Sequence, residues 1–122
     1  MRRGFQHNTI VRQEHLNQYG SLFGGTVLAI IDELAFIACT RTYPGRNFVT
    51  RAVLNAEFTA PAHLGDVLEF SFGVDRVGRT SVRVRVEMLV HDRSGAPPVL
   101  SFDGIVVMVC VDEHGEPARV KD

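Results

Sequence analysis

The sequence predicts an α+β fold in which a long antiparallel β-sheet wraps around one central, buried α-helix. Three observations indicate this fold. One segment long enough for a helix is apolar on all sides, the segments after it alternate apolar with polar residues, and turns containing Gly or Pro separate those segments. With 122 residues, the chain is expected to form a single domain over residues 1–122.

The helix is predicted over residues 24–41, which read GGTVLAIIDELAFIACTR. Its apolar residues surround the helix axis instead of forming a stripe, which is typical of a buried helix. Pro44 and Gly45 then provide the signal that ends it.

After the helix the apolar residues recur with a period of two, which predicts strands with one buried face. These strands are expected over residues 48–58, 68–75 and 82–90. The run 105–111 is apolar on both faces, so it is expected to be central or covered by a partner, and a short first strand is expected near residues 9–12. Turns at 76–79 and 92–98 predict hairpins, and therefore an antiparallel meander. A small sheet covers one helix incompletely, so at least a dimer is expected.

Composition excludes several classes of protein. The 13 basic residues balance 14 acidic residues, which argues against a nucleic-acid partner bound through a general basic field. The N-terminus lacks the apolar core of a signal peptide, and no segment is long and apolar enough for a membrane span. Two cysteines form no disulfide framework, and no zinc-ligand spacing is present. A cytoplasmic protein without a membrane partner or a metal is expected.

Asp32 and Glu33 are the only charged residues of the predicted helix before Arg41. The helical neighbours of Asp32 at three and four residues are all apolar, and an unpaired carboxylate buried among them is costly. Asp32 is therefore either a general base in a dry pocket, the partner of a sheet arginine, or exposed at a helix edge. Glu33 points about 100° away around the helix and is the alternative active carboxylate, or a solvent or interface residue.

Three residues ahead of the helix body are candidates for holding a carbonyl oxygen. Gly24 and Gly25 open the helix, where free backbone N–H groups can stabilise an oxyanion, although two glycines also suit a turn with unusual dihedral angles. Asn17 can donate from its amide to a carbonyl oxygen, or serve only as a turn former before Gly20. Cys39, late in an apolar helix, is expected in the core.

The order and spacing of these residues resemble the hotdog-fold acyl-CoA thioesterases, the acyl-CoA hydrolase branch of the superfamily that includes 4-hydroxybenzoyl-CoA thioesterase. The pattern N-x-x-G-x-x-F-G-G, followed by an aspartate, is carried here by Asn17, Gly20, Phe23, Gly24, Gly25 and Asp32. Further elements of the family are matched in order by residues 58–61 with 65–66, by 77–81, and by 109–112 with 115–117. The resemblance therefore covers nearly the whole chain.

The resemblance implies a hotdog fold that dimerises by sheet extension, with dimers assembling into tetramers or hexamers and the active site at the dimer interface. Asp32 would activate water as a general base or attack the thioester directly as a nucleophile. The backbone N–H of Gly25, with that of Gly24, would hold the thioester oxygen. Asn17, from the opposite subunit, would position the carbonyl or the water.

The resemblance also implies an acyl-CoA substrate and no cofactor or metal. Phe23, Gly24, Thr80 and Ser81 would line the substrate site, with Thr80 or Ser81 alternatively orienting Asp32, and surface arginines would meet the CoA phosphates. Two other functions share the fold: a non-catalytic acyl-CoA-binding module, and a hydratase or dehydratase, which needs a His that the helix lacks. A third interpretation is purely structural, with Asp32 in an ion pair.

Overall fold

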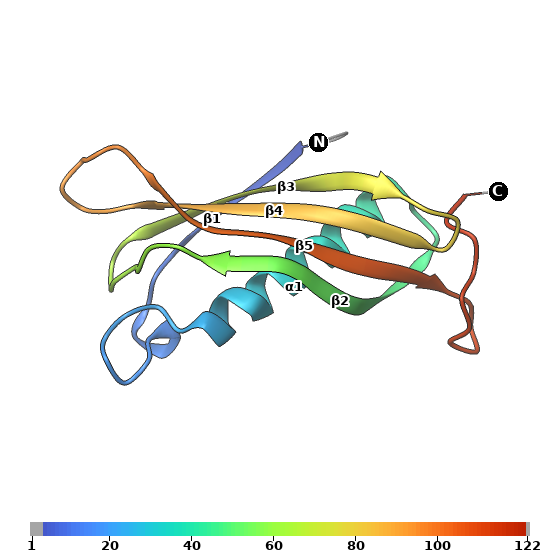
Figure 1. Cartoon of the computed structure of the whole chain (residues 1–122), viewed down its shortest axis with the longest axis horizontal. Coiled ribbons are helices and arrows are strands. Elements are labelled where there is room, and N and C mark those ends of the chain that lie inside the picture. The colour runs from blue at the N-terminus through green and yellow to red at the C-terminus, as the bar shows by residue number, and fades with distance from the viewer. Residues whose placement is uncertain (1–3, 122) are drawn as a thin grey trace.

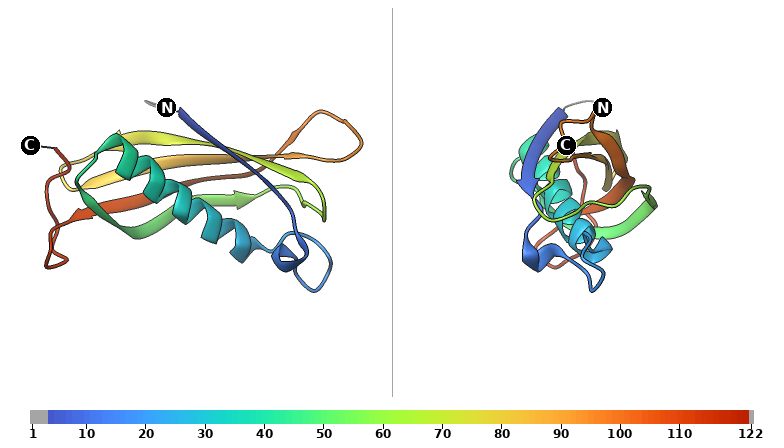
Figure 2. Two further views of the ribbon diagram at one scale, coloured as in Figure 1. Left: turned by 180° about the vertical axis from the view of Figure 1, so that it is seen from behind. Right: turned by 90° about the vertical axis from the view of Figure 1, so that its left-hand side faces the viewer.

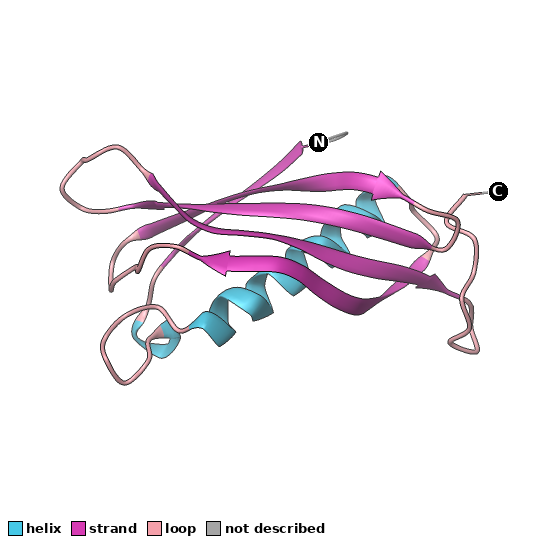
Figure 3. Cartoon of the chain, viewed as in Figure 1, coloured by secondary structure: helices cyan, strands magenta, loops and turns pink. Residues whose placement is uncertain are grey.

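In the computed structural model, which describes residues 4–121, an antiparallel five-stranded sheet curls around one long helix (Figure 1). The predicted α+β hotdog architecture is therefore confirmed. The elements in chain order are β1 (Gly4–Ile10), the 3₁₀ helix η1 (Gln13–His15), α1 (Gly24–Thr42), β2 (Asn47–Phe58), β3 (Val67–Val77), β4 (Ser81–His91) and β5 (Val99–Val111). The loop before α1 lies at one end of the molecule, and the β3–β4 hairpin lies at the other (Figure 3).

The strands follow the order β1-β3-β4-β5-β2 across the sheet. β3, β4 and β5 form the predicted meander through the two predicted hairpins, and β5 is central as expected. β2 lies outside this meander, because it pairs with β5 at the far edge of the sheet. The connection over residues 59–66 contains Pro61 and is too long for a tight hairpin, which frees β2 to take this edge.

Two strands begin earlier than the sequence indicated. β1 runs from Gly4 to Ile10, ahead of the predicted 9–12, and pairs with β3 from Gly4–Gly73 to Ile10–Val67. β5 begins at Val99, because its N-terminal half pairs with β4 although Ser101 and Gly104 interrupt its apolar pattern. Both edges of β3 are thereby paired, and the sheet curves around α1 (Figure 2).

α1 buries only one of its faces within the single chain. Its buried residues are Val27, Ile31, Leu34, Ala35, Ala38 and Cys39. Burial, together with the nearby Cys110, raises the pKa of the Cys39 thiol to about 12, so Cys39 is a core residue as predicted. Leu28 and Phe36, however, are 39% and 46% exposed. The expectation of a helix buried all round was therefore wrong for one chain.

The regular alternation predicted for β2 is broken by two irregularities. The register with β5 shifts between Thr50 and Ala52, and again between Leu54 and Glu57. Asn55, in the second irregularity, has a φ of 52°. Because each bulge turns the following side chains to the other face, Val53 lies opposite the core residue Val106.

Within residues 4–121, no helix is long and apolar enough to cross a membrane.

Replacing Leu34 by alanine tests the core between α1 and the sheet. Leu34 is 2% exposed, so Leu34→Ala is expected to lower the free energy of unfolding by about 2–5 kcal/mol, measured by urea denaturation. Leu64 is 53% exposed in a loop, and Leu64→Ala, the matched control, is expected to change it by less than about 0.5 kcal/mol. Equal losses in the two variants would contradict this assignment of the core.

Candidate active site

Asp32 lies midway along α1 on its exposed face, between Leu28 one turn before it and Phe36 one turn after it. Its Oδ1 accepts a hydrogen bond from the hydroxyl of Thr50 on β2. Among residues 4–121, no Lys, Arg or His lies within ion-pair distance of the Asp32 carboxylate. The alternative of an ion pair with a sheet arginine therefore does not hold for the described chain. The carboxylate of Asp32 instead lies on an apolar surface.

Thr50 reaches Asp32 because of its place on the edge strand. It is paired with Met108, which faces the core, so its side chain points to the same side of the sheet as α1. Its Oγ1 also lies 3.5 Å from the Met108 sulfur. From the sequence alone, Thr50 was predicted only as one residue of the strand expected over residues 48–58. The overlooked signal is the threonine hydroxyl itself, which stands in a row of apolar side chains and faces the carboxylate of Asp32.

The start of α1 presents two unpaired backbone donors. The carbonyl of Phe23 accepts from the N–H groups of Thr26 and Val27, at 3.0 and 3.3 Å, whereas no acceptor within residues 4–121 takes the N–H of Gly24 or Gly25. These two donors lie at the positive end of the helix dipole, which favours a developing negative charge. A Cβ at Gly25 would lie 2.8 Å from the ring of Phe23, so the ring occupies the space that a side chain at Gly25 would need.

Asn17 is held in the loop that precedes α1. Its Oδ1 accepts from the backbone N–H groups of Tyr19 and Ser21, at 2.9 and 3.1 Å, and its Nδ2 lies 3.3 Å from the Ser21 hydroxyl. The turn-forming function considered for Asn17 is therefore real. The same bonds fix the amide orientation and leave one N–H of Nδ2 without an acceptor among the described residues.

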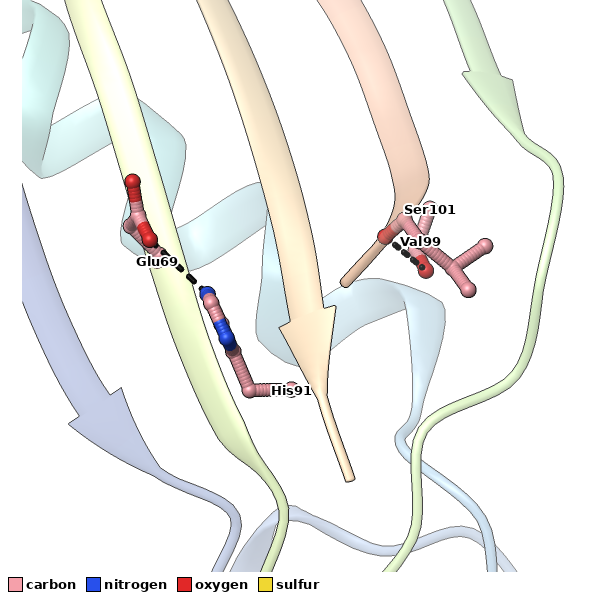
Figure 4. Close-up of polar contacts among 4 residues, drawn as sticks. All are labelled: Glu69, His91, Val99 and Ser101. Atoms are coloured by element: carbon pink, nitrogen blue, oxygen red, sulfur yellow. Dashed lines mark hydrogen bonds and ion pairs between the residues drawn. The ribbon is translucent and has the colours of Figure 1, made fainter. Parts of the chain in front are cut away.

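A pocket of about 350 Å³ adjoins the N-terminal end of the helix. Its lining is mostly apolar and includes Gly24, Val27, Phe58, Pro61 and Met88. Ser101 is also part of the wall, but its hydroxyl donates to the carbonyl of Val99, 3.3 Å away (Figure 4). A small apolar group next to Gly24 fits this pocket.

On the sheet face away from α1, a side-chain hydrogen bond links the neighbouring strands β3 and β4. His91 Nε2 at the end of β4 lies 2.8 Å from Glu69 Oε1 on β3, as Figure 4 shows. No three His, Cys, Asp or Glu side chains of residues 4–121 are arranged to hold a metal ion.

The predicted site residues fall into separate groups within one chain. Gly25 and Asp32 are seven residues apart on one helix, which places them about 10 Å apart along its axis. An oxyanion donor lies about 2.7–3.1 Å from the carbonyl oxygen, and a general base lies about 2.6–3.2 Å from the water that it activates, so both groups must converge on one carbonyl. Two residues this far apart along one helix do not converge in this way. Ser81 and Thr80 lie at the β3–β4 hairpin, and the alternation of β4 puts Ser81 on the sheet face away from α1. They do not contact Asp32 within the chain.

Comparison with known proteins agrees with this fold. The family model described as the thioesterase superfamily matches residues 19–95. An acyl-CoA thioester hydrolase of Zymomonas mobilis is 30% identical over 111 residues, covering 91% of this chain and 74% of its own length. A similarly named protein of Haemophilus influenzae is 29% identical over 115 residues, covering 92% of this chain and 74% of its own length.

Solved structures give the same result. A hexameric acyl-CoA thioesterase superposes with a TM-score of 0.87 at 31% identity, covering 95% of this chain and 74% of its own. The acyl-CoA hydrolase of Staphylococcus aureus, solved with butyryl-CoA and CoA, superposes with a TM-score of 0.86 at 28% identity, covering 95% and 70%. The chain belongs to the thioesterase superfamily.

Proposed function

We propose that this protein is an acyl-CoA thioester hydrolase whose active site is assembled from two copies of the chain. One copy supplies Asp32 and Thr50, and the other supplies Gly25, Gly24 and Asn17. The observation that carries this proposal is the Asp32 carboxylate, which accepts the Thr50 hydroxyl on an exposed apolar face and has no cationic partner among residues 4–121. Such a carboxylate is available to take a proton once a second copy excludes bulk water.

The separation along α1 supports a site shared between copies. Gly25 and Asp32 of one chain lie about 10 Å apart along the helix, too far to act on one carbonyl. The exposed apolar residues on the same side as Asp32, namely Leu28, Phe36 and Val53, lie on α1 and on the free edge strand β2. A second copy that covers this surface buries apolar area and brings another helix N-terminus toward Asp32.

The solved relatives support the choice of residues. Among the Staphylococcus aureus acyl-CoA hydrolase structures are variants in which an asparagine, an aspartate or a threonine is replaced by alanine. The replaced asparagine and aspartate are separated by the same number of residues as Asn17 and Asp32. The replaced threonine and aspartate are one residue closer together in the sequence than Thr50 and Asp32 are in this chain.

The chemistry needs only these groups. As water adds to the carbonyl carbon, Asp32 takes a water proton and the N–H of Gly25 stabilises the charge on the oxygen. The tetrahedral intermediate then breaks its C–S bond, releasing the acid, and the CoA sulfur receives the proton. In the alternative route Asp32 itself attacks the carbonyl carbon, and the C–S bond breaks to give a mixed anhydride and the CoA thiolate. Water then hydrolyses the anhydride to the free acid and the Asp32 carboxyl group, whose proton passes to the thiolate. In both routes Thr50 holds the carboxylate in position, and the pocket beside Gly24 receives the acyl group.

Replacing Asp32 by asparagine tests the catalytic carboxylate. Asp32→Asn keeps the shape but cannot take the proton, so kcat for butyryl-CoA hydrolysis, followed by thiol release, is expected to fall by about 10² or more. Glu33→Gln, the same change at the adjacent carboxylate, is the matched control and is expected to keep kcat within about threefold. The reverse pattern in two folded variants would transfer the catalytic function to Glu33.

Replacing Thr50 separates its hydroxyl from its shape. Thr50→Val removes the donor to Asp32 and is expected to lower kcat about tenfold, because a lost hydrogen bond to a charged group weighs about 1.5 kcal/mol. Thr50→Ser keeps the hydroxyl and is expected to retain most of the activity in the same assay. Equal activity in the valine and serine variants would remove Thr50 from the site.

Mixing two inactive variants tests the shared site. Asn17→Ala and Asp32→Asn are each expected to lose activity. After the two are unfolded and refolded together, random pairing of chains makes half of the dimers mixed, and each mixed dimer holds one intact site of two. The mixture is therefore expected to recover about a quarter of the wild-type rate. A mixture as inactive as its components, with mixed dimers confirmed by mass spectrometry, would contradict a site shared in this way.

A further inference from the structure

Two arginines lie directly opposite each other near the β3–β4 hairpin. Arg76 on β3 pairs with Arg83 on β4, and the ladder register shifts between Val74 and Arg76. Without this bulge, Asp75 would lie opposite Arg83 and the two strands would join an acid to a base. The bulge instead places two positive charges side by side, which is unfavourable in a sheet unless an anion lies between them.

No ion pair among residues 4–121 offsets this repulsion. No carboxylate of these residues lies within ion-pair distance of Arg76 or Arg83. The next arginine on the same face of β4 is different, because Arg85 is paired with Asp103 at 3.1 Å. Two guanidinium groups are therefore available on the sheet face away from α1.

A hydroxyl group completes this donor set. Arg76, Gly78, Ser81 and Arg83 line a pocket of about 240 Å³. A Cβ at Gly78 would lie 2.9 Å from Ser81 Oγ, so a side chain at this position would displace the Ser81 hydroxyl. The Ser81 hydroxyl has no hydrogen-bond partner among the described residues, and Ser81 lines the same pocket as both arginines.

The hairpin that carries these groups is fixed by backbone hydrogen bonds. Gly78 N–H donates to the Ser81 carbonyl at 2.7 Å, and Cys110 N–H on β5 donates to the Thr80 carbonyl at 2.8 Å. Val120 N–H, from the C-terminal segment, donates to the Arg79 carbonyl at 2.9 Å. The backbone that carries the donors is therefore held in place before any ligand binds, so only side chains have to be ordered on binding.

We infer that Arg76, Arg83 and Ser81 form a phosphate-binding site. Guanidinium groups bind phosphate oxygens through paired, charge-assisted hydrogen bonds, and a serine hydroxyl adds a neutral donor. The inference rests on the proposed function for one of its two ligand sources, the phosphates of the CoA part of the substrate. The sheet lies between the phosphate site and Asp32 of the same chain. A CoA whose phosphates bind here would therefore have its acyl end in the site of a neighbouring copy. The other source is a free nucleotide.

The experiment compares wild type with Arg76→Gln/Arg83→Gln. Calorimetry measures binding of CoA, 3′-dephospho-CoA and ADP, and steady-state kinetics compares butyryl-CoA with butyryl-pantetheine, which has no nucleotide. If the substrate supplies the phosphate, KM for butyryl-CoA and Kd for CoA are expected to rise about tenfold or more in the variant. The preference for butyryl-CoA over butyryl-pantetheine then falls by the same factor. If a free nucleotide supplies the phosphate, Kd for ADP rises about tenfold or more in the variant, and the preference for butyryl-CoA over butyryl-pantetheine is unchanged.

Arg93→Gln, at an exposed arginine in the β4–β5 loop, is the matched control and is expected to bind and react as wild type. Thermal melting checks that each variant is folded. Wild-type values for CoA, ADP and the substrate preference in a folded double variant would overturn the phosphate site. The proposed function fails by a different result, namely wild type that hydrolyses no acyl-CoA, and the binding measurements still test this site in that case.

Discussion

The structure depends on how little of α1 the sheet of one chain can cover. Five strands enclose one side of the helix and bury a row of aliphatic side chains from Val27 to Cys39. The opposite side keeps Leu28 and Phe36 partly exposed, with Asp32 between them. Apolar residues on both sides of a helix favour covering both sides, so the same constraint that favours association also surrounds the carboxylate.

The edge strand β2 supplies the residues that lie beside Asp32. Its first bulge follows directly after Thr50, so the threonine hydroxyl faces Asp32 while the strand beyond it turns to present Val53 on the helix side. The irregular edge thus combines a polar contact at the site with an apolar surface next to it. A regular strand would place Leu54, which here pairs with Ile105 on the far face, toward the helix instead.

Much of this could be predicted from the sequence, and the parts that could not have physical reasons. The helix was predicted within one residue of its end, since its length and Pro44-Gly45 are local signals. The meander was predicted for β3 to β5 because hairpin turns are local too. The position of β2 could not be predicted, because pairing with β5 is a contact between distant residues. The bulges at Arg51 and Asn55 depend on that pairing, and so does the contact of Thr50 with Asp32. The predicted site residues were located by the structure, but their convergence on one substrate stays a prediction.

The half-covered helix has a consequence for how this chain can change. The surface that a single chain leaves bare is also the surface around its candidate catalytic carboxylate. Substitutions that replace Leu28 or Phe36 with polar residues would make an isolated chain more soluble, and they would also admit water around Asp32. In the proposed two-copy site, solubility as a monomer and exclusion of water from the reaction therefore place opposite demands on the same few side chains, although none of them touches the reacting bond.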